Sequence, residues 1–282
     1  MDNVDKKGIL KRAPLFYVLT ATRFQSLELL PKWIPEIQNA LRERLPVFNK
    51  LHLSQGPVGV QGHVDGPDFD PEAPTSSWLF SRADRTLTVQ ISKASLVVHT
   101  RNYLTFKDFL AEVEFAYDAV MSQAKQVDVV QVGIRYLDLI DASDSGDLRQ
   151  YVNPAFLALD ETFVEGGEAI ASSALTTYKV DGDVVRVSFA TGTEVLSVPE
   201  DLLPPYLTSF DLAQIAAGAP VVGKLKLGQA TLDTDAAWQA QGSERMNFSD
   251  LAPVLSRLHD RANSMFRNIC SDKAFADWQG EP

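Results

Sequence analysis

Two aspartates near the end of the chain have the type and the spacing to do chemistry. Asp233 and Asp235 are two residues apart in a segment with the pattern of a β-strand, so both side chains should point to the same face of a sheet. Carboxylates about 7 Å apart in this arrangement could bind a divalent cation or divide the roles of acid and base. They could equally lie on a solvated sheet face or form an ion pair with an arginine.

Three further residues extend this candidate site. Arg135 lies in an apolar strand beside Tyr136, and both are candidate binding residues. A buried arginine needs a carboxylate partner, and the Asp233/Asp235 pair is the best candidate for it. His259, on the last long helix, could be a general base, or a partly buried histidine bonded to a carbonyl or a carboxylate. The candidate catalytic residues of a metal-dependent hydrolase are therefore Asp233, Asp235 and His259.

Other motifs that would complete a catalytic or cofactor site are missing from the sequence. The 4 histidines include no His-Glu-x-x-His spacing, and there is no nucleophile elbow, phosphate-binding loop or dinucleotide fingerprint. The acidic segment 141–147 fails the EF-hand pattern, since Val152 stands where the bidentate glutamate should be. The single cysteine, Cys270, excludes an internal disulfide and every multi-cysteine zinc module. We therefore expect no cofactor and no metal.

The charge balance bears on possible partners. The chain has 26 basic and 37 acidic residues, a net charge of −11, which disfavours nucleic acid because a phosphate backbone usually requires a basic face. The densest basic stretch is Lys6, Lys7, Lys11 and Arg12, in a segment expected to be a mobile tail. It could be an ordinary solubilising terminus or an arm that docks on DNA or RNA. Another protein or a second copy of the chain is the preferred partner.

The expected location is the cytoplasm. The first twelve residues are polar and mixed in charge, unlike a secretory signal, and no window approaches the roughly 20 apolar residues that span a bilayer. A lone cysteine suits a reducing compartment. We expect no membrane partner.

Hydrophobic periodicity predicts the elements that must position these residues. The chain has 282 residues, of which 45% are hydrophobic, enough to form a substantial core. Apolar residues at three- and four-residue steps predict helices over 30–45, 106–124 and 250–270. Alternating patterns predict strands over 13–24, 48–60, 77–82, 86–92, 95–100, 127–140, 169–180, 184–190, 194–198, 206–215 and 224–238.

This order predicts an α+β protein with two mostly antiparallel sheet halves, each packed by long amphipathic helices. The first half resembles an elaborated ferredoxin-like, or split βαβ, unit. The expected boundaries are a mobile tail at 1–12, an N-terminal half at 13–141, a linker region at 142–168 and a C-terminal half at 169–282.

The chain also resembles a sporadically distributed family of uncharacterised bacterial proteins of about this length. The resemblance is carried by four places in the sequence: Pro14-Leu15 to Arg23-Phe24, Gly133-Ile134-Arg135-Tyr136, Asp233-Thr234-Asp235, and Leu258-His259 with Phe266 and Trp278. It implies no activity, cofactor or catalytic set. A sporadic distribution is typical of mobile cassettes for phage defence or of toxin–antitoxin type.

The function we expect is therefore a non-catalytic protein that binds another macromolecule, as a sensor or accessory subunit of such a defence cassette. The alternatives are the metal-dependent hydrolase and nucleic-acid binding through the basic tail.

Overall fold

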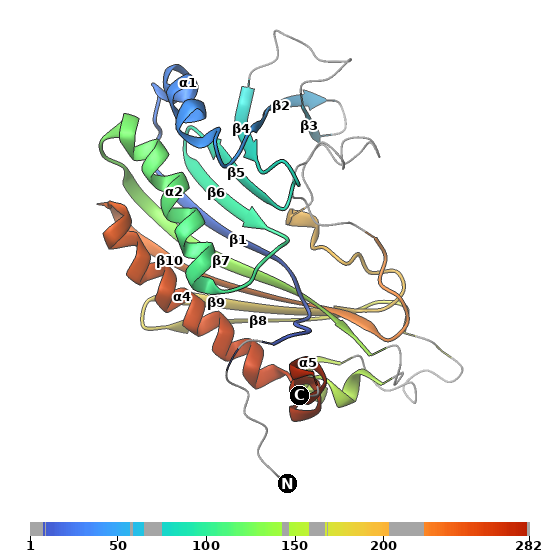
Figure 1. Ribbon diagram of the computed structural model, residues 1–282. Helices are drawn as coiled ribbons and strands as arrows, with labels where there is room; N and C mark the ends of the chain where they lie inside the picture. Colours follow the sequence, from blue (N-terminus) through green and yellow to red (C-terminus); the bar gives the residue numbers. More distant parts are fainter. Residues whose placement is uncertain are drawn as a thin grey trace.

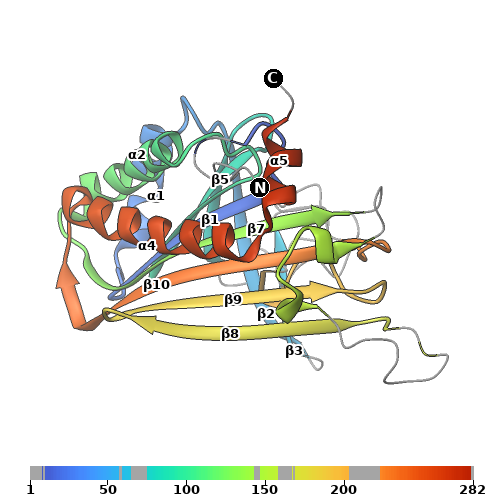
Figure 2. The same cartoon turned by 90° about the horizontal axis from the view of Figure 1, so that it is seen from below.

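The chain folds around one large antiparallel sheet, which confirms the α+β class. The computed structural model describes residues 8, 10–56, 59–64, 75–142, 147–157, 167, 169–202 and 223–280. The sheet has ten strands in the order β3-β2-β4-β5-β6-β1-β7-β10-β9-β8. Its long helices lie along one face, and the strands form a twisted layer beneath them (Figures 1 and 2).

The longest strands, β7 and β10, are neighbours within the sheet. Their bounds are β1 Leu15–Phe24, β2 Val47–Gly56, β3 Gly59–Val64, β4 Thr75–Ser81, β5 Leu87–Ser92, β6 Ser95–Thr100, β7 Asp128–Asp141, β8 Ser172–Val180, β9 Asp183–Thr191 and β10 Gln229–Arg245. Most of them coincide with the predicted strands to within a few residues. Segment 194–198 forms only an isolated bridge, between Leu196 and Lys224. The predicted strand over 206–215 lies outside the described residues.

Three α-helices were predicted, and within the described residues a fourth was missed. The helices are α1 Leu30–Leu41, α2 Phe106–Ala124, α4 Phe248–Ile269 and the short α5 Asp272–Gln279. Side chains fix where the long helices begin: the Thr105 hydroxyl accepts the N–H of Asp108, and Asn247 and Asp250 form a capping box. The short helix escaped prediction because its eight residues hold too few apolar positions for a clear period.

Strand pairing joins the two halves of the chain into one sheet, in place of the two sheet halves expected. The long strand β10 pairs with β7 from Gln229, opposite Asp141, to Arg245, opposite Asp128, with one irregularity on the way. The strand β7 can take this central position because both of its faces are largely apolar. The finer expectation of a ferredoxin-like first half stays a prediction, as do the domain boundaries.

The first half is organised around β1. This strand lies between β6 and β7 and is antiparallel to both, so β6 and β7 run parallel to each other. Helix α2 connects them across the covered face of the sheet (Figure 1). The main core fills the space between that face and helices α1, α2 and α4.

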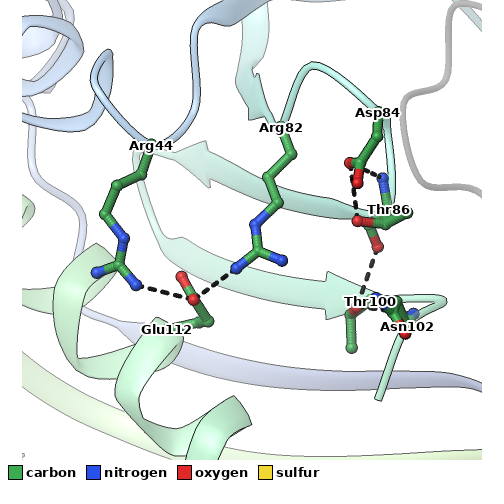
Figure 3. Close-up of polar contacts among 7 residues, drawn as sticks. All are labelled: Arg44, Arg82, Asp84, Thr86, Thr100, Asn102 and Glu112. Atoms are coloured by element: carbon green, nitrogen blue, oxygen red, sulfur yellow. Dashed lines mark hydrogen bonds and ion pairs between the residues drawn. The ribbon is translucent and has the colours of Figure 1, made fainter. Parts of the chain in front are cut away.

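An ion-pair cluster fastens α2 to the segments around it. Glu112 accepts hydrogen bonds from Arg44 Nη2 at 2.8 Å and from Arg82 Nη2 at 2.6 Å (Figure 3). Arg44 follows α1 and Arg82 follows β4. The Arg44 guanidinium also lies 4.3 Å from the centroid of the Phe115 ring. One carboxylate thus connects both helices to the sheet.

Helix α4 is fastened to the tip of the β8–β9 hairpin. Asp183 is buried and its Oδ2 accepts hydrogen bonds from Arg257 Nε at 2.9 Å and Arg261 Nε at 2.7 Å. Burial opposes the charged form of Asp183, but these hydrogen bonds lower its pKa below the ordinary value. The helix is therefore held over β9 and β10, where its residues line the site described below.

None of the helices in the described part of the chain combines the length and the apolar character needed to cross a bilayer.

Candidate functional site

The structure brings together two of the residues singled out in the sequence, Arg135 and Asp233. Arg135 Nε lies 2.8 Å from Asp233 Oδ1, and Arg135 Nη2 lies 2.7 Å from Asp233 Oδ2. The two residues are 7% and 3% exposed. Arg135 also donates from Nη1 to Asp201 Oδ2 at 2.6 Å and from Nη2 to Asp201 Oδ1 at 3.1 Å. One guanidinium thus holds two carboxylates in paired geometry.

The second aspartate of the pair does not take part in these hydrogen bonds. Asp235 lies directly opposite Arg135 in the strand register, whereas Asp233 is opposite Leu137. The contact therefore runs diagonally between the strands, over a distance that a long arginine side chain can reach. Burial raises the pKa of Asp235, with the charges of Arg135 and Arg186 opposing the rise.

The electrostatics of the cluster favour a charged guanidinium. Burial lowers the pKa of Arg135, but the hydrogen bonds with Asp233 and Asp201 raise it further than burial lowers it. The same contact lowers the pKa of Asp201. Asp201 belongs to a short 3-10 turn, Glu200–Leu202, so the cluster fastens this turn to the sheet. This geometry suits a structural ion pair, with the Asp233 carboxylate engaged by arginine.

His259 lies on the other face of the sheet. Its Nδ1 is 2.6 Å from the Tyr136 hydroxyl, and its ring stacks on Phe106 with centroids 4.1 Å apart. Burial lowers the pKa of His259. Because successive side chains of a strand alternate between faces, Tyr136 and Arg135 point in opposite directions.

The candidate catalytic set is therefore not assembled. Thr234 is opposite Tyr136 and shares its face, whereas Asp233 and Asp235 point to the other side. The sheet itself separates both carboxylates from His259. Across the residues that the structure describes, no group of three or more histidines, cysteines, aspartates or glutamates is placed to hold a metal ion.

A cavity of about 250 Å³ opens on the helix-covered face beside His259. Asp138 of β7 and Thr234 of β10 lie among the residues that line it, together with Tyr136. Asp138 is 3% exposed, and burial, assisted by the charge of Asp233, raises its pKa to about 8. The Thr234 hydroxyl is buried and has no hydrogen-bond partner. Sequence reasoning missed Asp138, although an acid in the middle of an apolar strand is the signal that could have found it.

The basic tail is only partly within the described residues. Lys6 and Lys7 lie outside them, whereas Lys11 and Arg12 are both exposed. The Arg12 main-chain N–H donates to the Trp278 carbonyl at 2.9 Å, so this part of the segment lies against α5.

The edge strand β8 carries an exposed surface. It pairs with β9 only, and no other strand of the described chain adjoins it. Leu175 and Tyr178 on β8 and Val184 on β9 are among the most exposed large hydrophobic residues. Lys179 is the only charged residue in this strand of 9. An edge of this length and composition lacks the charges and prolines that usually block further pairing.

Searches for related proteins did not find a match: no protein-family model matches this chain, and no curated protein is significantly similar to it.

Proposed function

We propose that this chain is a non-catalytic macromolecule-binding protein, and that its binding edge is strand β8. The observation that supports this proposal is the open outer edge of β8, nine residues long with one charge. Backbone N–H and C=O groups along such an edge are a template for another strand. The partner that fits the edge best is a second copy of the chain.

Self-pairing of β8 is free of charge conflict. In an antiparallel pair of two β8 strands centred on Thr176, each Thr176 faces its own copy. Every other residue faces the residue equally far from Thr176 on the other side, so all nine residues are paired. Lys179 then faces Ser173, and Leu175 faces Thr177, so like charges are not opposed. The pair would join two ten-stranded sheets into one continuous sheet.

From the resemblance described in the sequence analysis, we further propose that this binding protein is a sensor or accessory subunit of a phage-defence or toxin–antitoxin type cassette. A subunit of this kind acts by association, so a strong open edge suits it. The two alternatives receive less support. The hydrolase would need Asp233 and His259 on one face, and nucleic-acid binding would rest on a tail of which only Lys11 and Arg12 are described.

Charge substitutions at the centre of the pair test the proposal. Thr176→Lys and Thr176→Glu each place like charges directly opposite across the two-fold axis, so each variant alone should dissociate. An equimolar mixture of the two should reassociate, because lysine then faces glutamate. The measurement is molar mass by sedimentation velocity over a wide concentration range, where the wild type should show twice the 31.1 kDa of the chain.

The control is Leu227→Lys, a substitution of equal charge at an exposed position outside β8. It should leave the dimer intact. A wild-type protein that stays monomeric at every concentration, or single variants that remain dimeric, would overturn the proposal.

A further inference from the structure

The cavity beside His259 belongs to neither the binding edge nor the arginine cluster. Its floor is formed by β7 and β10, and one wall by α4. Tyr103, which precedes α2, and Phe106, its first residue, also line the cavity. A volume of about 250 Å³ lies just below the range of ordinary small-molecule sites, so a single ring system with a short side chain would fit.

Asp138 is a buried polar residue that lines this cavity. Its carboxyl lies on the buried face of β7, and no arginine or lysine among the described residues lowers its pKa. Among the described residues, the one charge that acts on it is the negative charge of Asp233 on the opposite face. A cation that entered the cavity would stabilise the charged form of this carboxyl group.

Thr234 is a second, independent indication of a ligand. The residue is 1% exposed, its Oγ1 has no hydrogen-bond partner, and it lines the same cavity. An unsatisfied buried hydroxyl costs free energy, so such a group calls for an explanation, and a bound ligand is one that its position supports.

Aromatic rings complete the cavity. Tyr136 meets Tyr103 edge to face, with centroids 6.0 Å apart. The rings that line the cavity are those of Tyr103, Phe106, Tyr136, His259 and Phe266. Aromatic faces attract organic cations, and a carboxylate at the end of an aromatic pocket adds a counter-ion.

We infer that this cavity binds a small organic cation, a primary amine on a flat aromatic body, with Asp138 as its counter-ion and the Thr234 hydroxyl as a hydrogen-bond acceptor. The inference does not depend on the proposed dimer. A protonated amine would enter, its N–H groups would donate to Asp138 and Thr234, and the Asp138 proton would leave to water. No covalent bond forms or breaks other than that O–H bond.

The other charged and titratable groups around the cavity include one cation, Arg267, whose charge also lowers the pKa of His259. Burial keeps the pKa of His259 low, so its ring is neutral near pH 7. Arg267 lies at the rim, where it donates to Asn263 Oδ1 at 2.9 Å and to the Gly8 carbonyl at 3.2 Å. The remaining titratable groups that act on the lining residues are Tyr103, Asp108, Tyr136, Asp233 and Asp260.

Calorimetry with tryptamine as the probe tests the inference, and tryptophol, its neutral alcohol analogue, is the matched ligand. The full chain should bind tryptamine and not tryptophol. Because Asp138 must lose its proton, the affinity for tryptamine should rise about 50-fold between pH 6 and pH 8. Titrations in buffers of different ionisation enthalpy should show that close to one proton is released per ligand at pH 6.

Two substitutions and one control locate the site. Asp138→Asn should abolish tryptamine binding, and Thr234→Val should weaken it several-fold. Asp141→Asn, the same change in the same strand but outside the cavity lining, should have no effect. Thermal unfolding of each variant checks that it folds.

Several results would overturn the inference. These are equal affinity for the two ligands, an affinity for tryptamine that falls as pH rises toward 8, or tryptamine binding that survives in a folded Asp138→Asn variant. The results of these titrations bear only on this site, because the dimer is tested separately by sedimentation.

Discussion

Arg135 on β7 and Asp233 on β10 are joined by two hydrogen bonds, of 2.8 and 2.7 Å, although they are not opposite each other in the strand register. Both side chains are almost fully withdrawn from water. Both oxygens of Asp233 are thus engaged by Arg135 and are not available as a catalytic carboxylate would be. The ion pair links β7 to β10 at the centre of the sheet. The consequences for stability can be measured directly.

The first prediction concerns removal of the arginine. Arg135→Met should lower the free energy of unfolding by about 3–5 kcal/mol, because it leaves a buried carboxylate without a partner. Replacing both residues, in Arg135→Met with Asp233→Leu, should recover most of this loss, since neither charge is then buried. Urea denaturation of the two variants and the wild type gives the values.

The matched control is Asp201→Asn, which removes the other carboxylate bound by Arg135. The Asp201 side chain is 57% exposed, so this variant should lose less than about 1 kcal/mol. If Arg135→Met were as stable as the wild type, the pair would not have the structural role given to it.

The second prediction concerns pH. In the folded protein the pKa of Asp138 is about 8, whereas in the unfolded chain the carboxyl ionises near pH 4. Between these values the folded state binds more protons than the unfolded state, so the free energy of unfolding contributed by Asp138 falls as pH rises. Asp138→Asn removes this effect and should gain stability relative to the wild type between pH 5 and pH 8.5, by at most about 5 kcal/mol.

Urea unfolding at the two pH values measures this difference. Asp118→Asn, at an exposed position of α2, controls for the loss of one negative charge. A difference between Asp138→Asn and wild type that stays constant with pH would contradict the assignment.

The third prediction compares two glycines of the β8–β9 hairpin: Gly192, which follows β9 at the open end, and Gly182 at the tip. Gly192 has a φ of +113°, and a Cβ there would lie 2.3 Å from the main-chain oxygen of Ile170. Gly192→Ala should therefore be strongly destabilising, because backbone atoms would have to move. Gly182 also has a positive φ, +89°, but a Cβ there would meet nothing within 4 Å.

Comparing the two variants separates steric clash from backbone strain. Gly182→Ala should cost about 1–2 kcal/mol, from the positive φ alone. Gly192→Ala should cost more, as seen in the melting temperature. Equal losses would show that the loop at Ile170 can move aside.

Local sequence patterns determined most of the elements. Helix α2 was predicted with its bounds, because apolar residues repeat at helical spacing within it. The strands β5, β6 and β7 were predicted from the alternation of apolar and polar residues. Arg135 was singled out because it is a charged residue among apolar neighbours. These features depend on residues that are close together in the chain, so one sequence is sufficient to reveal them.

Only the tertiary structure decided how those elements combine. Sequence could not show that β10 pairs with β7 to make one sheet, because strand pairing depends on contacts between residues about a hundred positions apart. The register puts Asp233 on the same face as Arg135, within reach of its side chain, and puts Asp138 and Thr234 on the other face, where both line one cavity beside His259 of α4. In a sheet with a period of two, a shift by one residue would exchange those faces, so the chemistry of this protein depends on its pairing register.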